Sequence, residues 1–275
     1  GNPIDTRKHI YCQSFAIYAL SEYYKATKNE EALNLAMELF ELIEGVGFNK
    51  ENSAYLEEFD REWNITPNEM LSENGVIAEI TTNTHLHVLE GYTTLYEITK
   101  NEAVREKLKN LIYTFYNKIY DKENHFLKIF FDGNWNTIID VKSYGHDIEA
   151  SWLIDEAYKV LNLKDEAIEK MIIDIAYNIK SQIQEDGSLI NESENGVKDY
   201  TRIWWVQVEA MVGYLNAYER THDEEFLKIV NNLMKYTMEN MVDKREGGEW
   251  YWSIEPNGKP TERSVIEPWK TPYHN

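Results

Sequence analysis

The segment SYGHDIEASW places a histidine and two carboxylates directly after a glycine, at the start of an apolar run. His146 and Glu149 are three residues apart and therefore share one face of a helix. A carboxylate beside an imidazole orients the ring and favours its protonated form, so such a pair is suited to proton transfer near neutral pH. The same segment also fits a helix start, with Ser143 or Gly145 opening the helix and Asp147 in the first turn. The segment alone leaves both interpretations open.

The segment TTNTHLHVLE raises the same question for His85 and His87. In a strand, the two rings would point the same way and suggest a metal site. In a helix, residues two apart diverge by about 200°. Because the surrounding pattern is helical, we expect His85 in a packing stripe and His87 in a polar stripe with Asn83 and Glu90. A polar stripe is either solvated or, on an inner helix, faces a cavity.

Two aromatic segments complete the candidates. RIWWVQVEA carries Trp204, Trp205 and Glu209, and WKTPYHN carries Trp269 and His274. Adjacent tryptophans cannot share one helix face, so we expect one in the core and the other available to stack on a sugar ring. The closing turn fits either an ordered tail or a site loop.

Helical periodicity dominates the elements that must position these residues. Turn signals occur at Asp132-Gly133-Asn134 and Pro256-Asn257-Gly258, and they predict short hairpins in the connecting loops. Helices are predicted at 8–27, 30–44, 82–98, 102–120, 146–161, 164–183, 200–219 and 223–242.

The helices form pairs in which the first is apolar on several faces and the second is amphipathic. A helix that is apolar nearly all round is buried, whereas an amphipathic one lies outside. Inner and outer helices in alternation predict an all-α fold of the α/α toroid type. The starting ends of inner helices share one rim of a toroid, so we expect His87, His146, the two tryptophans and His274 to converge there.

Composition excludes several functions. The chain has 275 residues and a net charge of −20, with 28 basic and 48 acidic residues, which argues against nucleic acid or an anionic membrane as partner. The single cysteine, Cys12, permits no internal disulfide or thiolate zinc cluster and suits a cytoplasmic protein. No apolar run approaches the roughly 20 residues of a membrane span. Several histidines without a metal-ligand set indicate proton transfer.

The motifs together resemble the cellobiose 2-epimerases of the acylglucosamine 2-epimerase superfamily. The residues that carry the resemblance occur in order along the chain: NTHLHVLE follows SENG (72–75), and SYGHDIEASW, RIWWVQVEA, REGGEWYW and WKTPYHN follow in turn. The resemblance implies an (α/α)6 barrel and an epimerase that needs no cofactor and no metal. It further implies inversion at C2 of the reducing-end glucose of β-1,4-linked disaccharides, turning cellobiose into glucosyl-mannose and lactose into epilactose.

The resemblance also assigns roles to individual residues. It implies that His146 and His274 are the paired acid/base residues, that His87 is the third active-site histidine and that Glu149 supports His146. An open-chain sugar has a C2 proton acidic enough for a histidine to remove, and an enediolate protonated from the opposite side is inverted at C2. His87 would hydrogen-bond the developing oxyanion. The implied sugar contacts are Asn83, Trp204, Trp205, Glu209, Trp269, Tyr11 and Phe15.

The sequence departs from the family pattern at both ends. Members of the family have about twelve helices, and about eight are predicted here, without the early helix that carries an arginine of the site. We therefore expect residues 1–275 to form a single α/α barrel domain that is incomplete at both ends, a fragment with weak or no epimerase activity. Oligomeric state is not readable from the sequence.

Three alternatives remain beside disaccharide epimerisation. An (α/α)6 glycoside hydrolase would need two carboxylates flanking the bond, for which Glu149 and Glu209 are candidates. A monosaccharide or N-acylglucosamine 2-epimerase, or an aldose–ketose isomerase, would use the same histidines. A non-catalytic sugar-binding protein would use the aromatic residues alone.

Overall fold

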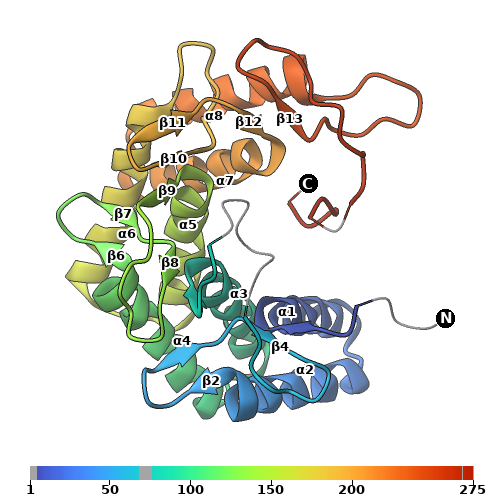
Figure 1. Cartoon of the computed structure of the whole chain (residues 1–275). Coiled ribbons are helices and arrows are strands. Elements are labelled where there is room, and N and C mark those ends of the chain that lie inside the picture. Colours follow the sequence, from blue (N-terminus) through green and yellow to red (C-terminus); the bar gives the residue numbers. More distant parts are fainter. Residues whose placement is uncertain (1–4, 68–75, 268, 275) are drawn as a thin grey trace. The chain divides into compact units, whose positions relative to one another are not determined.

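The computed structural model describes residues 5–67, 76–267 and 269–274 of the chain (Figure 1). In this part, eight α-helices are joined alternately by tight links and by long loops that contain two- and three-residue strands. The SENG motif at 72–75 lies outside the described residues. The helices are α1 Ile10–Thr27, α2 Glu30–Leu42, α3 Thr82–Thr99, α4 Glu102–Thr114, α5 Tyr144–Val160, α6 Glu166–Ile179, α7 Trp204–Thr221 and α8 Glu224–Tyr236.

A common link joins the helices of three pairs. The first helix ends at a residue in the left-handed region, Lys28, Lys100 or His222, with φ of 60°, 51° and 54°. The next residue, Asn29, Asn101 or Asp223, caps the second helix by accepting backbone N–H bonds through its side chain. A sharp reversal followed directly by a cap forces a tight helical hairpin.

Three of the second helices end in a single π-helical turn, which the sequence does not predict. These turns are η1 Ile43–Gly47, η2 Phe115–Ile119 and η4 Thr237–Met241, and α6 is followed instead by a 3₁₀ turn, η3 Lys180–Gln182. The predicted helices 30–44, 102–120, 164–183 and 223–242 each run into the turn that follows, so they are too long as α-helices.

The structure also corrects predicted helix starts. α1 begins at Ile10 rather than residue 8, because Lys8 and His9 form β1 and pair with β4, Glu58–Phe59. α7 begins at Trp204 rather than residue 200, because Arg202 and Ile203 form β12 and pair with β13, Ser253–Ile254. α5 begins two residues early, at Tyr144, directly after β9, Val141–Ser143. Both predicted turns are present, with Asp132 N–H bonded to Asn136 O and Glu255 N–H to Lys259 O.

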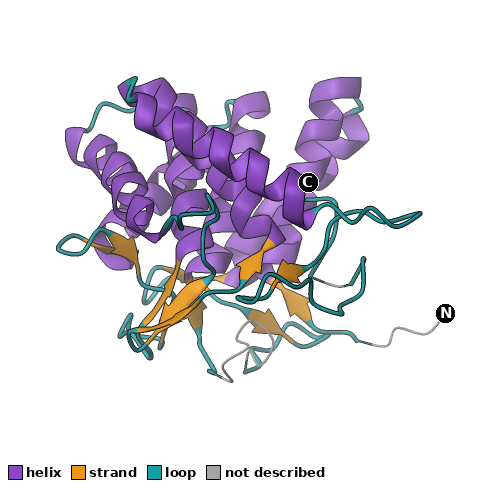
Figure 2. Cartoon of the chain, turned by 90° about the horizontal axis from the view of Figure 1, so that it is seen from above, coloured by secondary structure: helices purple, strands orange, loops and turns teal. Residues whose placement is uncertain are grey.

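The remaining strands are equally short and lie in the loops (Figure 2). β1 pairs with β4, β2 with β3 and β5 with β8, all antiparallel, and β10 pairs with both β9 and β11. Their bounds are β1 Lys8–His9, β2 Phe48–Asn49, β3 Ala54–Tyr55, β4 Glu58–Phe59, β5 Ile80–Thr81, β6 Tyr120–Asp121, β7 Phe126–Leu127, β8 Phe130–Phe131, β10 Glu192–Glu194 and β11 Val197–Asp199.

The chain divides into two compact units. The first comprises Gly1–Tyr120, Lys128–Ile139 and Leu153–Ile168, and the second comprises Asp121–Leu127, Asp140–Trp152 and Glu169–Asn275. In the first unit α1 packs against α2 and α3, and α3 packs against α4. In the second, α7 packs against α8, and an apolar cluster includes Trp204, Tyr236, Met241, Trp252 and Ile254. That the whole chain is one domain stays a prediction.

In α3, α5 and α7, the side chain of the fourth helical residue accepts a hydrogen bond from the backbone of a loop. His85 of α3 accepts the Tyr55 N–H, Asp147 of α5 accepts the Leu127 N–H, and Gln207 of α7 accepts the Leu189 N–H. Each side chain is fully buried, and burial raises the pKa of Asp147 well above its usual range. These hydrogen bonds hold the first turns of the three helices in place. Asn83, His146 and Trp205 lie on these first turns.

Among the described residues, every helix is too short or too polar to span a lipid bilayer.

Candidate active site

His146 lies in the first turn of α5, and its ring is held from the strand that precedes the helix. The Oγ atom of Ser143, the last residue of β9, lies 2.7 Å from Nδ1 of His146. Ser143 is buried, and its backbone is paired with Glu192 of β10. Because Nδ1 is engaged by Ser143, Nε2 is the nitrogen through which His146 would exchange a proton with a ligand.

His274 is held by a carboxylate instead. Its Nδ1 donates to Oε1 of Glu209 at 2.7 Å, and Oε2 of Glu209 accepts from the indole Nε1 of Trp152 at 2.9 Å. Glu209 is buried on α7, whereas Trp152 lies on α5. With Nδ1 engaged, Nε2 is the nitrogen through which His274 would exchange a proton with a ligand. Glu209, predicted as a sugar contact and as one of two carboxylates in the hydrolase alternative, therefore also holds a histidine.

Trp205 contacts both of these histidines. Its ring is stacked on that of His274, with centroids 5.3 Å apart and an interplanar angle of 28°, and it is tilted against His146 at 4.9 Å. A single indole thus spaces the two imidazoles, which lie in the same unit. The predicted convergence of His146, Trp205 and His274 is present within this unit.

Gly145 permits this arrangement. A Cβ atom at this position would meet Cη2 of Trp205 at 2.6 Å and Cγ2 of Val206 at 2.8 Å. Carbon atoms do not approach this closely, so any larger side chain at 145 must displace the start of α7 or the indole. The glycine before His146 is therefore a packing requirement of the site.

Glu149 lies beside the second carboxylate of the cluster. One oxygen of Glu149, one oxygen of Glu209 and one ring nitrogen of His274 all lie within 4.8 Å of one another. A metal ion could use such a spacing, but both oxygens of Glu209 already accept hydrogen bonds. We therefore interpret the cluster as proton-handling. The support of His146 by Glu149 stays a prediction.

The two adjacent tryptophans divide as expected. Trp204 is 1% exposed and packs on Trp252 in the core of the second unit, with ring centroids 4.5 Å apart. Trp205 is partly exposed. The expectation that one of the pair is a core residue is confirmed, and Trp205 rather than Trp204 remains the candidate for stacking on a sugar.

In the first unit, His87 is part of an aromatic row. Its ring lies 4.5 Å from that of Phe15, which is 6.0 Å from Tyr11, and Nδ1 of His87 lies 3.1 Å from Oε2 of Glu90. Of the predicted sugar contacts, Phe15 thus contacts His87, and Tyr11 lies next to Phe15. The predicted convergence of His87 with His146 stays a prediction, because the two residues lie in different units.

His85 has the structural role predicted for it. It is fully buried, with Nδ1–H donating to Thr81 O at 2.8 Å and Nε2 accepting from Tyr55 N–H at 3.1 Å. Burial lowers its pKa to about 4, so the ring is neutral. Both nitrogens are used within the protein, which excludes a metal bound between His85 and His87.

Asn83 and Trp269 stay predictions as sugar contacts. Asn83 is partly exposed one helical turn before His87. Trp269 is 40% exposed, an unusual exposure for an indole and consistent with a contact to a ligand.

Several candidate residues occupy equivalent positions in their helices. This equivalence was missed in the sequence. Counted from the start of each helix, the second residues of α1, α3, α5 and α7 are Tyr11, Asn83, Gly145 and Trp205, and the sixth are Phe15, His87, Glu149 and Glu209. Positions four apart share one face. Aligning the helix starts would have shown this face. The hydrogen bonds of Ser143 and Glu90 to the histidines were also missed, although each lies three residues from its histidine. Trp152 has no such signal toward Glu209.

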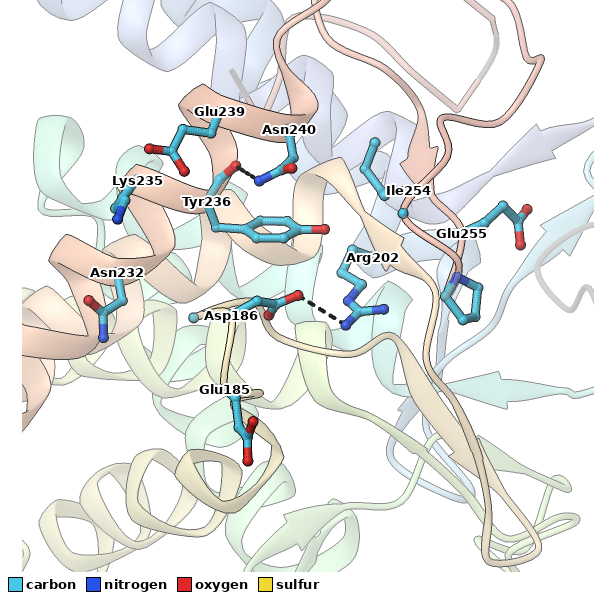
Figure 3. A pocket seen from close by; sticks show the side chains of 13 residues that line it. Glu185, Asp186, Arg202, Asn232, Lys235, Tyr236, Glu239, Asn240, Ile254 and Glu255 are labelled. Carbon is cyan, nitrogen blue, oxygen red and sulfur yellow. Dashed lines mark hydrogen bonds and ion pairs between the residues drawn. The ribbon is translucent and has the colours of Figure 1, made fainter.

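A separate pocket of about 410 Å³ lies in the second unit and includes Arg202, Tyr236 and Glu239 in its lining (Figure 3). Arg202 is bonded to Asp186 at 3.2 Å and to Ser188 and Tyr200. No predicted site residue lines this pocket. Since its arginine is already bonded within the protein, we base the candidate site on the histidine cluster.

Comparison with known proteins identifies the family. The model of the N-acylglucosamine 2-epimerase (GlcNAc 2-epimerase) family matches residues 1–275. The chain belongs to this family. The cellobiose 2-epimerases of Dictyoglomus turgidum and Ruminococcus albus are 46% and 45% identical to it, and each match covers the whole chain and 71% of the relative. This membership of the N-acylglucosamine 2-epimerase family confirms the predicted enzyme class, a carbohydrate epimerase and hence an isomerase.

Solved structures confirm the predicted fold class. The cellobiose 2-epimerase of Bacillus thermoamylovorans is 59% identical and superposes with a TM-score of 0.97, covering all of this chain and 71% of its own. A structure of D-mannose isomerase, 20% identical, gives a TM-score of 0.83 and shows only that the fold is shared. The chain is thus an all-α protein of the α/α barrel class.

Proposed function

We propose that this protein epimerises the reducing-end glucose of β-1,4-linked disaccharides at C2, taking cellobiose to glucosyl-mannose and lactose to epilactose. The observation that carries the proposal is the pair formed by His146 and His274. Each has Nδ1 bonded within the protein, at 2.7 Å, and both rings contact Trp205. Two imidazoles that both have Nδ1 bonded within the protein and both contact one indole suit proton removal and return at one carbon.

The chemistry follows from the open-chain sugar. With the ring opened, the C2 proton lies next to the C1 aldehyde, and a neutral imidazole removes it through Nε2 to give an enediolate. The second imidazole, protonated, returns a proton to the opposite face and so inverts C2. No electrons are gained or lost overall, so the reaction itself calls for no redox cofactor. His87 is proposed as a hydrogen-bond donor to the enediolate, as the resemblance implies.

Cellobiose is favoured over a monosaccharide by similarity. The relatives at 46% and 45% identity are cellobiose 2-epimerases, whereas D-mannose isomerase is 22% identical and N-acylglucosamine 2-epimerase 24% over less than half of the chain. Hydrolysis is the less suitable alternative. One oxygen of Glu149 and one of Glu209 lie within 4.8 Å, which is shorter than the roughly 6.5–9.5 Å of inverting hydrolases and near the roughly 5–5.5 Å of retaining ones. Both oxygens of Glu209 already accept hydrogen bonds, from His274 and Trp152, which makes Glu209 a poor nucleophile.

Incubation of the protein with cellobiose in D₂O, followed by NMR over a time long enough to detect weak turnover, tests the proposal. We expect glucosyl-mannose with deuterium at C2. Free glucose would indicate a hydrolase, and an unchanged disaccharide a sugar-binding protein; either outcome contradicts the proposal. Parallel samples with lactose, mannose and N-acetylglucosamine define the substrate class, and preference for a monosaccharide would contradict the disaccharide assignment.

Substitution of the histidines tests their roles. His146→Ala and His274→Ala should each abolish deuterium incorporation, because each removes one of the two acid/base groups. His222→Asn is the matched control, since His222 is an exposed residue at the end of α7 and should leave turnover unchanged. Near-normal turnover in either of the first two variants would overturn the two-histidine mechanism.

A further inference from the structure

Ser143 is a buried hydroxyl in direct contact with a proposed acid/base residue, and the chemistry above does not say whether it donates to Nδ1 or accepts from it. It is 5% exposed, and its Oγ lies 2.7 Å from Nδ1 of His146. Its backbone belongs to β9, which is paired with β10 through Val141, Lys142 and Ser143, and the next residue, Tyr144, donates its N–H to Asn191 O. The three-stranded sheet therefore fixes the hydroxyl independently of α5.

The partner atoms of the two histidines differ in chemistry. Glu209 at His274 is a carboxylate and only accepts, so it holds a proton on Nδ1. A serine hydroxyl both donates and accepts, and it carries no charge. When Oγ accepts from Nδ1–H, Nε2 of His146 has a lone pair and is a base. When Oγ donates to Nδ1, Nε2 carries the proton, and the neutral ring cannot remove one from carbon.

We propose that Ser143 is a positioning residue that orients the His146 ring and holds its proton on Nδ1. The inference rests on the proposed function of His146. During turnover, Nδ1–H stays bonded to Oγ, and Nε2 takes the proton from C2. The electron pair of the broken C–H bond enters the enediolate, and the proton is later lost from Nε2 to substrate or solvent. No other reactant is needed.

Ser143→Ala tests the role, with Ser143→Thr as the conservative variant. Losing one hydrogen bond that orients a reacting group should lower kcat roughly tenfold, with KM changed less than about twofold. The pH profile of kcat should also shift, since the ring loses its partner at Nδ1. Ser143→Thr keeps a hydroxyl and should recover most of the activity. Ser151→Ala is the matched control, because Ser151 is a buried serine of α5 that bonds Ile148 O.

The tautomer of His146 is the second readout. In protein labelled with ¹⁵N-histidine, the ring signals of His146 are assigned by their loss in His146→Ala. In the native protein they should report a proton on Nδ1, and in Ser143→Ala a mixture or the Nε2–H form. A merely structural serine would lower the melting temperature without moving the tautomer.

The outcomes separate this inference from the proposed function. Unchanged kcat, or reduced kcat with native tautomer and pH profile, overturns the role of Ser143 even when His146→Ala is inactive. Activity of His146→Ala overturns the proposed function instead, whatever Ser143→Ala shows.

Discussion

Glu209 bonds two side chains from distant parts of the sequence, and this places it at the centre of the candidate site. One oxygen accepts from His274 and the other from Trp152, at 2.7 and 2.9 Å. A carboxylate used in this way holds the imidazole in one orientation and one tautomer, so its main effect should be on the chemical step. A carboxylate that only contacts sugar would instead affect substrate binding.

Glu209→Gln distinguishes these two effects. The amide keeps the shape of the side chain but removes the charge and one acceptor, so His274 should lose its fixed orientation. We expect kcat to fall about a hundredfold or more, with KM within about threefold of the native value. Steady-state kinetics on cellobiose measures both. Glu219→Gln, an exposed change on the same helix, is the control. A raised KM with unchanged kcat would assign Glu209 to sugar binding alone.

At the scale of elements, the close approach of α5 to α7 determines where Trp205 lies. Gly145→Ala would place a methyl group 2.6 Å from the indole. Alanine favours a helix by about 1 kcal/mol over glycine, but the contact forces the ring or the helix to move. We expect kcat to fall at least about tenfold and the melting temperature to drop. In Gly45→Ala, nothing lies within 4 Å of the new methyl group, so it serves as control. A Gly145→Ala enzyme with higher stability and native kcat would show that the close approach of α5 to α7 is not needed for activity.

The sequence predicts elements better than it predicts partners. Helix pairs were readable because periodicity is local and because Asn29, Asn101 and Asp223 are typical caps. The start of α7 was not, because Arg202 and Ile203 pair with a strand about fifty residues later.

Among the contacts of the candidate site, those between residues close in the sequence are also more predictable than those between distant residues. His87–Glu90 and Ser143–His146 are each three residues apart and accessible to helical reasoning. His274–Glu209 spans 65 residues, and no local spacing encodes it. The family resemblance supplied the identity of these residues, and the structure supplied their hydrogen bonds.

At the scale of the whole molecule, two buried groups make stability depend on pH in opposite directions. Glu57 is buried and accepts hydrogen bonds from Thr81 and Thr84, yet burial raises its pKa from 4.5 to about 7. The folded chain therefore holds this proton more tightly, and stability is lost as pH rises from 4.5 through 7. Burial lowers the pKa of His85 from 6.5 to about 4, so its contribution is lost as pH falls from 6.5 through 4.

Between about pH 4.5 and 6.5 these two slopes oppose each other, each approaching 1.4 kcal/mol per pH unit. Glu57→Gln removes one of them and keeps an oxygen able to accept from Thr81. In this variant the free energy of unfolding should rise with pH across the window, relative to the native chain, and run parallel to it above about pH 7.5. Urea unfolding at half-unit pH intervals measures the difference, with the exposed Glu51→Gln as control. A pH dependence identical in native chain and Glu57→Gln would mean that Glu57 titrates as an ordinary carboxyl. If the two stability curves run parallel above pH 7.5 and diverge below it, the proton that the folded chain holds is on Glu57. Glu57 lies next to the start of α3, the helix that carries His87.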